Sequence, residues 1–396
     1  MPQTLPSITS PVSSPLSIED PHLAMRKVDW ANLECYPLSL VLDKLEEHID
    51  HVRFGVVCKT WLSIAKLNHK NHQFRINVPP MLMILPNKLS HRHAKSKRKK
   101  RSLYSILSEK EYPIQLSHPA IFKSKRCLGC SHGWHALVDD NHAITLANPF
   151  KCSIPPISLP HLEHLNQVTL SADPITSPSD YVVAAIYNFG FLAFKRASQS
   201  SWIRVHASEF SFTNVVFYKG LVFADTEGDI IVSFKFNDPP CNDSNDPNFI
   251  YFEKIASTPY FLPEECYYRN AYFVKSLTGD IWMVKRCLVD PQKHSYKLFV
   301  FKLELDAQSG KVEQINKLES LENNILFVGI GDSISVSAPC FSKFEKDSIY
   351  FICHGDGDDL ELQIYNAKDG SLRSQSLLVS FKGMQHLWVL PQFQWD

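Results

Sequence analysis

The chain has 396 residues, which is enough for a small module and one large domain, or for two ordinary domains. Its 41 Lys and Arg residues balance its 41 Asp and Glu residues, so no net charge draws the whole chain towards nucleic acid or a membrane. Its ten cysteines form no dense framework, which is typical of a reducing compartment. We therefore expect a protein of the nucleus or cytoplasm, with neither nucleic acid nor membrane as a partner.

Residues 1–27 are rich in Ser, Thr and Pro. The first 25 of them contain no Lys or Arg and no sustained apolar core, so the segment lacks the features of a secretory signal. We expect it to be a disordered tail.

Residues 28–72 place apolar side chains at helical spacing. They form two registers, Leu38, Val41, Leu42, Leu45, Ile49 and Val52, then Phe54, Val57, Cys58, Trp61, Ile64 and Ala65. Both follow the i, i+3, i+4, i+7 rule, and Pro37 suits the first turn of a helix. We predict two or three short amphipathic helices. So small a module needs a partner because it cannot bury all its apolar faces alone.

The same module resembles an F-box. The resemblance is carried by Pro37, the Leu40-Val41 pair, Leu45 and the block RFGVVCKTW at residues 53–61. Tyr36 and Leu38 flank the proline where the family usually has Leu and an acidic residue. The resemblance implies docking onto the Skp adaptor of a cullin–RING ubiquitin ligase through Pro37, Leu40, Val41, Leu45, Val57, Cys58 and Trp61. From helical spacing alone, the alternative is a cap or a dimerisation hairpin.

Residues 73–396 alternate strand-like runs with turn signals. Runs such as 181–186, 230–234 and 281–284 are rich in β-branched and aromatic residues. Gly228-Asp229 and Gly279-Asp280 each join an aromatic strand to an Ile-led one, as in a β-hairpin. Hairpins that recur about every 40–50 residues indicate a propeller, here of about five to seven blades. We predict a mainly β protein, with a β-propeller-like domain preceded by a small all-α module.

This region also resembles the plant F-box-associated domain called DUF295, whose later name is the KIB-type β-propeller. Six blocks carry the resemblance in order: 81–86 (MLMILP), 101–106 (RSLYSI), 127–134 (CLGCSHGW), 144–150 (ITLANPF), 328–339 (VGIGDSISVSAP) and 347–351 (DSIYF). Cys130 stands where the family more often has Ser.

An F-box usually precedes this domain. Together the two resemblances imply a plant substrate-recognition subunit of an SCF-type E3 ubiquitin ligase. The helical module would bind the Skp adaptor, and through it the cullin, while the β domain would bind an unknown target protein. Such an adaptor acts by proximity, so we expect no catalytic residue, cofactor or metal. The alternative is a β-propeller with a helical cap that binds a protein or ligand outside any ligase.

Residues 127–135 allow two further interpretations. Gly129-x-Ser131-x-Gly133 fits the nucleophile elbow of serine hydrolases, but a strand-like run follows where that motif needs a helix. The pair Cys127 and Cys130, with His132 and His135, has metal-ligand residue types, but no second zinc knuckle follows. We predict a glycine-rich turn that enters a blade. Likewise, residues 355–359 (GDGDD) lack the spacing of an EF-hand and predict a hairpin turn.

Residues 91–101 (HRHAKSKRKKR) concentrate positive charge in an otherwise neutral chain. We expect a basic, flexible insertion over 88–101, because like charges repel and keep the segment solvated. As a nuclear-import signal it would use Lys95, Lys97, Arg98, Lys99, Lys100 and Arg101. The alternative is a solvated insertion without that role.

Overall fold

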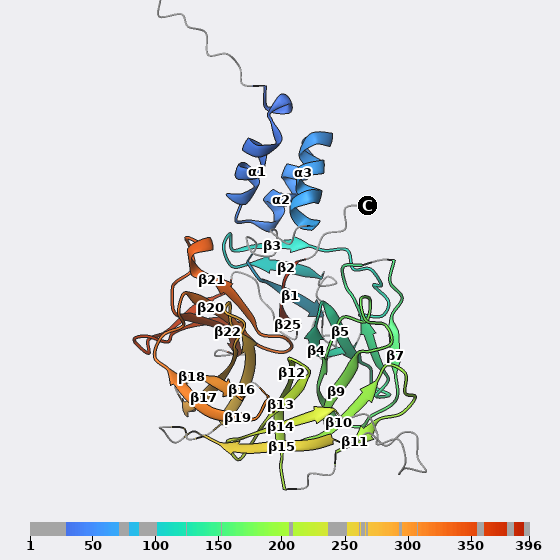
Figure 1. The fold of residues 1–396 in the computed structure, drawn as a ribbon. Coiled ribbons are helices and arrows are strands. Elements are labelled where there is room, and N and C mark those ends of the chain that lie inside the picture. The colour runs from blue at the N-terminus through green and yellow to red at the C-terminus, as the bar shows by residue number, and fades with distance from the viewer. Residues whose placement is uncertain are drawn as a thin grey trace, which may run out of the picture.

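The computed structural model describes residues 29–70, 79–86, 101–123, 125–151, 153–205, 209–236, 252–260, 262, 266, 268–292, 295–306, 308–354, 360–377 and 384–391. Within these ranges, three helices precede a ring of six β-sheets (Figure 1). The predicted fold, a β-propeller after a small helical module, is confirmed. The tail at 1–27, most of the basic insertion and the acidic turn at 355–359 lie outside the described residues.

The helical module contains α1 (Cys35–Asp43), α2 (His48–Gly55) and α3 (Lys59–Lys70), after a short 3₁₀ helix, η1 (Trp30–Asn32). Pro37 lies in the first turn of α1, as its missing N–H favours. The first apolar register is interrupted at residues 44–47, between α1 and α2. The module buries its own small core of Leu38, Leu42, Phe54, Ile64 and Ala65.

Each sheet is one blade of the propeller, in which the first-named strand lies nearest the channel and the others follow outwards. Blade 1 contains β25 (Met384–Val389), β1 (Met81–Pro86), β2 (Ser102–Ser105) and β3 (Lys110–Pro113). Blade 2 contains β4 (Arg126–Ser131), β5 (Trp134–Val138), β6 (Ile144–Ala147) and β7 (Ile157–Leu159). Blade 3 contains β8 (Leu165–Leu170), β9 (Val182–Tyr187), β10 (Phe191–Arg196) and β11 (Ile203–Arg204).

The second half of the ring completes the pattern. Blade 4 contains β12 (Phe212–Tyr218), β13 (Leu221–Thr226), β14 (Ile230–Phe236) and β15 (Phe252–Pro259). Blade 5 contains β16 (Tyr268–Lys275), β17 (Ile281–Asp290), β18 (Ser295–Leu305) and β19 (Val312–Leu318). Blade 6 contains β21 (Ile334–Ser337), β20 (Asn324–Val328), β22 (Ser348–His354), β23 (Leu360–Asn366) and β24 (Leu372–Ser376), and a 3₁₀ helix, η3 (Ala338–Cys340), follows β21.

The ring is closed by the two ends of the propeller sequence. β25 pairs antiparallel with β1, so that Met81 lies opposite Val389. Six apolar clusters fill the spaces between neighbouring blades. In β1, Met81 and Met83 face blade 2 while Leu82 and Ile84 face blade 6. Because both faces of such a strand are buried, its sequence is a continuous apolar run instead of an alternating one.

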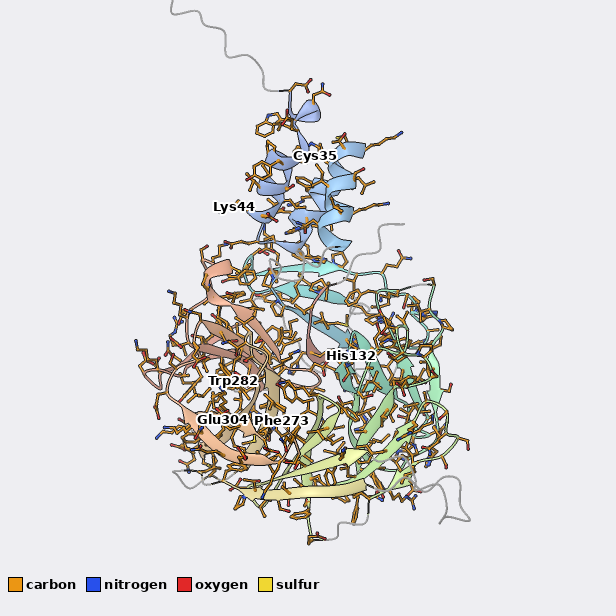
Figure 2. All side chains as sticks on the ribbon, viewed as in Figure 1. Cys35, Lys44, His132, Phe273, Trp282 and Glu304 are labelled. Atoms are coloured by element: carbon orange, nitrogen blue, oxygen red, sulfur yellow. The ribbon has the colours of Figure 1, made fainter. Side chains whose placement is uncertain are left out.

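Turns alternate between the two faces of the ring because neighbouring strands within most blades are antiparallel. We call the side with turns 139–143, 188–190 and 227–229 the front face, and the side with turns 106–109, 132–133 and 219–220 the back face. The helical module projects from the outer edge of blade 1 (Figure 1). Cys35 and Lys44 lie at the far and near ends of α1 (Figure 2). No helix among the described residues is long and apolar enough to cross a bilayer.

Two glutamates at the start of α2 tie the module to the back face. Ser105, at the end of β2, donates its hydroxyl to both carboxylate oxygens of Glu47, at 3.0 and 3.1 Å. Ser342 of blade 6 donates to Glu46 at 3.2 Å. Burial raises the pKa of Glu47, although its hydrogen bonds oppose that shift. The connection between α1 and α2 therefore contacts both blades that flank the closure of the ring.

Candidate functional site

Two surfaces of the molecule have the features of binding sites. The first is on the helical module, where seven large apolar side chains are exposed, and five of them lie on α1 or in the turn between α2 and α3: Tyr36 (73%), Leu40 (47%), Val41 (36%), Val56 (74%) and Val57 (55%). Three of them lie on α1, and two lie in the turn between α2 and α3. Apolar side chains left in water on a small module mark an interaction surface, because their burial in a partner is favourable.

The seven docking residues predicted from sequence divide into two groups. Leu40, Val41 and Val57 are exposed. The other four are partly buried: Pro37, Leu45, Cys58 and Trp61. Trp61 packs against Phe54 with ring centroids 4.4 Å apart and donates its indole N–H to the carbonyl of Trp30 at 3.1 Å. Leu45 packs against the core of the module. These two residues therefore contribute to the folding of the module itself.

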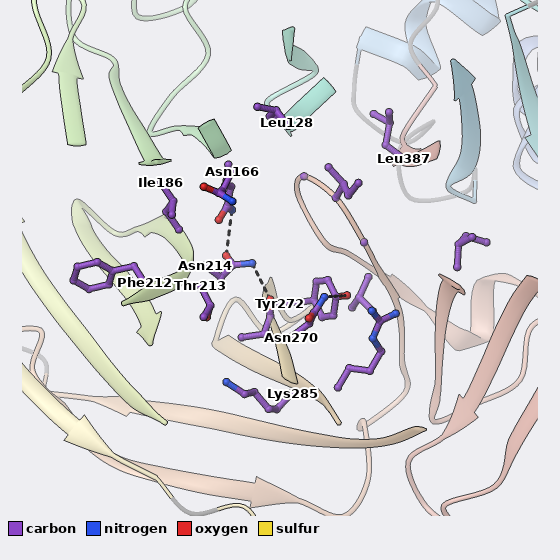
Figure 3. Close-up of a pocket in the computed structure, with 18 of the residues that line it drawn as sticks. Leu128, Asn166, Ile186, Phe212, Thr213, Asn214, Asn270, Tyr272, Lys285 and Leu387 are labelled. Carbon is purple, nitrogen blue, oxygen red and sulfur yellow. Dashed lines mark hydrogen bonds between the residues drawn. The ribbon is translucent and has the colours of Figure 1, made fainter. Parts of the chain in front are cut away.

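The second surface is a pocket of about 940 Å³ in the central channel, lined by residues from all six blades. It lies near the amino-terminal ends of the inner strands, towards the front face. Polar side chains link adjacent inner strands across its wall (Figure 3). The Gln167 amide donates to Asn214 Oδ1 at 3.3 Å, and the Asn214 amide donates to the carbonyl of Ala271 at 2.8 Å. Blades 3, 4 and 5 are joined in this way.

A loop from blade 6, residues 329–333, reaches across the channel and forms the floor of the pocket. Asp332 accepts hydrogen bonds from Ser131 Oγ at 3.1 Å and from the backbone N–H of His132 at 3.2 Å. Its own N–H donates to the carbonyl of Cys130 at 2.7 Å. Gly331 packs so closely on blade 2 that a Cβ there would lie 2.7 Å from the Cys130 nitrogen. The sequence blocks 127–134 and 328–339, separated by about 200 residues in the chain, therefore meet in the channel.

These contacts also test the interpretations that the sequence allowed for residues 127–135. Ser131 is buried, and its hydroxyl also shares a hydrogen bond with Thr169 at 2.8 Å. The predicted turn is confirmed: His132 and Gly133 form a tight turn with positive φ between β4 and β5, so no helix follows the serine. Burial raises the pKa of the Cys127 thiol to about 11 and also raises that of Cys130. Among the described residues, no three His, Cys, Asp or Glu side chains are placed to hold a metal ion.

A buried ion cluster lies where blades 4 and 5 meet the pocket. The Lys285 ammonium contacts Asp225 at 2.9 Å and Asp229 at 3.5 Å. Tyr260 and Thr213 also donate their hydroxyls to Asp225, at 2.6 and 2.5 Å. Burial and the neighbouring Asp225 carboxylate raise the pKa of Tyr260, which keeps the phenol protonated as a donor. The positive charge of Lys285 is more than matched by the two carboxylates, and the cluster links two blades.

At the front rim of the pocket, Phe189 is 84% exposed, the largest fraction among the large apolar side chains of the described residues. Its φ is +64°, and the preceding Asn188 has φ +44°. A hydrogen bond from the Gly190 N–H to the Tyr187 carbonyl, at 3.1 Å, closes the turn. A bulky residue rarely adopts this left-handed conformation, and strain of this kind is concentrated at functional sites.

Sequence reasoning did not identify the residues of the channel. One signal was available: Lys285 and Arg286 are adjacent cations inside the otherwise apolar strand β17. Side chains of neighbouring residues in a strand point to opposite faces, so two adjacent cations indicate polar or aromatic surroundings on both faces of the blade. Among the six residues of the predicted import run, the structure describes only Arg101, which donates to the carbonyl of Pro119 at 2.9 Å. The other five lie outside the described residues.

No curated protein matches the chain. Among solved structures, it is similar to TolB from Acinetobacter baumannii, with 12% identity, 78% of this chain and 66% of that chain covered, and a TM-score of 0.40. It is also similar to the periplasmic gluconolactonase PpgL of Pseudomonas aeruginosa, with 8% identity, 79% and 99% covered, and a TM-score of 0.38.

A third similar structure is the β-propeller domain of Cps50 (Swd1) from Myceliophteria thermophila, with 10% identity, 70% of this chain and 76% of that chain covered, and a TM-score of 0.32. Similarities this distant carry no functional argument. The family model of the KIB1-4 β-propeller matches residues 103–371, which is more than half of the chain and extends from β2 to the turn between β23 and β24 of blade 6. The chain therefore belongs to the KIB1-4 β-propeller family.

Proposed function

We propose that this protein is the substrate-recognition subunit of an SCF-type E3 ubiquitin ligase in a plant. Its helical module binds the Skp adaptor, and through it the cullin, in the nucleus or cytoplasm. Its propeller binds the target protein. The observation that carries the proposal is the exposed apolar surface of the F-box-like module, which projects away from a propeller of this family (Figure 1).

Burial of the exposed side chains supplies the driving force for docking. Full burial of a Leu or Val side chain contributes about 1.5–3 kcal/mol, and Leu40 and Val57 each still expose about half of their surface. Each therefore contributes about 1 kcal/mol when a partner covers it. Val41, Tyr36 and Val56 enlarge the same docking surface.

The role is that of an adaptor, and we propose no catalytic group in this chain. The propeller holds a target while the ligase complex brings the ubiquitin-charged enzyme within reach, so the rate is raised by effective concentration. The placement of the two surfaces supports this role. The module contacts the back face through Ser105, whereas the channel pocket lies towards the front face. A target in the channel then leaves the docking surface free.

The test is a calorimetric titration of the full-length chain with purified Skp adaptor. The double variant Leu40→Ser/Val57→Ser should bind about 10- to 100-fold more weakly than the wild type, because two apolar contacts are lost. Both side chains are exposed, so the variant should keep its melting temperature. Leu40 and Val57 are better suited to the test than Pro37 and Trp61, which are both partly buried. Trp61 also packs on Phe54 inside the module.

Leu277→Ser is the matched control. Leu277 is 48% exposed, almost the same as Leu40, but it lies in a back-face turn of blade 5. This variant should bind the adaptor like the wild type. Equal affinity of the double variant and the wild type would refute docking through this surface. Absence of binding by the wild type would favour the alternative, a β-propeller with a helical cap that binds a protein or ligand outside any ligase.

A further inference from the structure

Arg286 differs from its neighbour Lys285 in having no compensating charge. Successive side chains of a strand point to opposite faces, so Lys285 faces blade 4 while Arg286 faces blade 6. The Lys285 ammonium is matched by Asp225 and Asp229. In the part of the chain that the structure describes, Arg286 has neither an ion pair nor a hydrogen bond, and none of its nitrogens is sealed from solvent.

Three aromatic rings surround the Arg286 guanidinium. Its Cζ lies 5.8 Å from the ring centroid of Tyr272, 5.1 Å from that of Tyr296 and 5.3 Å from that of Phe351. Two rings come from blade 5 and the third comes from blade 6. Such contacts hold a cation through the faces of the rings and use none of its N–H donors. The guanidinium is therefore positioned, permanently charged and still able to donate.

The pocket around Arg286 suits an extended acidic segment. Its volume of about 940 Å³ is large enough for several side chains. Asn270 and Tyr272 add polar groups to the lining (Figure 3). His386 adds another, and Glu227 is the one acidic residue among the described lining residues. Since Lys285 is already neutralised, Arg286 supplies the uncompensated charge. A planar guanidinium with free donors matches an oxyanion, which it can bind through two parallel hydrogen bonds.

We propose that the channel pocket recognises an acidic peptide segment of the target, with one of its oxyanions bound by Arg286. The inference rests on the proposed role of the propeller as the target-binding domain, but it does not require docking to the Skp adaptor. The oxyanion is either the carboxylate of an Asp or Glu or the phosphoryl group of a modified Ser. Both offer the same geometry to the guanidinium.

The experiment measures the binding of three fluorescein-labelled Gly/Ser peptides by anisotropy at low salt. One peptide carries four Glu residues, the second carries four Gln residues and the third carries four phosphoserines. The Glu peptide should bind and the Gln peptide should not. Stronger binding of the phosphoserine peptide would assign the oxyanion to a phosphoryl group, whereas equal or weaker binding would assign it to a carboxylate.

Arg286→Met should weaken binding of the Glu peptide about tenfold or more, because a charge-assisted pair is lost while an unbranched side chain still fills the aromatic site. Arg286→Lys keeps the positive charge but loses the paired N–H donors of the guanidinium. Its affinity for the Glu peptide should therefore lie between the affinities of Arg286→Met and the wild type. Arg204→Met is the matched control, since Arg204 is exposed and lies 5.9 Å from the Tyr187 ring outside the channel. It should bind like the wild type.

Unchanged binding by a folded Arg286→Met variant would overturn the proposal, and so would equal binding of the Glu and Gln peptides. If Arg286→Met fails to fold, the comparison of Arg286→Lys with the wild type decides instead. Adaptor binding is measured separately on the same samples, and Arg286→Met should bind the Skp adaptor like the wild type. Loss of adaptor binding by the wild type would refute the ligase role and leave peptide binding as an independent result.

Discussion

At the scale of single residues, two side chains lie in environments that cost stability. Phe189 exposes an aromatic ring from a left-handed turn in which the second central position favours glycine. His135 is fully buried, and neither of its ring nitrogens has a hydrogen-bond partner among the described residues. The first residue lies at the rim of the pocket and the second lies between blades 1 and 2. Each permits a test by substitution.

Phe189→Gly should be more stable than Phe189→Ala by about 1 kcal/mol, because alanine keeps the penalty of the left-handed conformation and glycine does not. Both variants remove the same ring, so the difference isolates the backbone. Urea unfolding of the two proteins measures it. If alanine proves the more stable, as in an ordinary strand or helix, the turn is not strained and Phe189 no longer indicates a functional rim.

His135 should make the protein sensitive to acid. Burial lowers its pKa from 6.5 to about 3, so between these values the unfolded chain binds a proton that the folded chain does not. Stability is therefore lost as the pH falls through this window, by about 2 kcal/mol from this group between pH 7 and pH 5. His135→Leu should remove that part of the loss. Denaturant unfolding at both pH values measures it, and equal losses in the two proteins would contradict the assignment.

At the scale of elements, the loop at 329–333 determines the shape of the pocket. Gly331 has φ +96° and leaves no room for a Cβ beside Cys130. Asp332 fixes the loop to the turn between β4 and β5. A short loop between two strands therefore joins blade 6 to blade 2 across the channel and closes its back side.

Gly331→Ala should destabilise the protein by about 2 kcal/mol or more, because steric overlap adds to the backbone penalty. Gly220→Ala is the control: Gly220 has φ +77° but nothing within 4 Å of an added Cβ. The free energy of unfolding of Gly220→Ala should fall by only about 1 kcal/mol. Thermal or urea unfolding compares the two variants. Equal losses would show that the loop moves away from blade 2 without cost.

Elements with two buried faces or strong turn signals could be predicted from the sequence, and polar outer strands could not. Residues 181–186 and 230–234 were predicted as strands from their apolar, β-branched and aromatic sequences, which follow from the burial of both strand faces. The outer strands β3 (KEYP) and β24 (LRSQS) are mostly exposed and have polar sequences, so only their pairing reveals them. The closure of the ring joins residues about 300 positions apart, which no local pattern contains.

The binding surfaces could be predicted only in part for the same reason. The F-box resemblance places Leu40 and Leu45 among the docking residues, but only the packing of the module distinguishes the exposed Leu40 from the partly buried Leu45. Arg286 meets Phe351 through the contact of two blades, and its unpaired state depends on Lys285 facing the other way. Local sequence does not encode such neighbours.

At the scale of the whole molecule, the proposed function makes the protein a two-ended adaptor. The docking surface of the module and the channel pocket share no residues, and the module projects from the outer edge of blade 1, away from the channel (Figure 1). The glutamates between α1 and α2 hold the module against blades 1 and 6. A target in the channel and a ligase on the module would therefore be held in a defined relative position.

The most direct measurement is the mass, by light scattering, of the species formed when the full-length chain is mixed with purified Skp adaptor. We predict a stable complex with one copy of each protein, and loss of that complex in the Leu40→Ser/Val57→Ser variant. Two separate species in the wild-type mixture would contradict the adaptor role. The channel pocket would then belong to a binding protein that works outside any ligase.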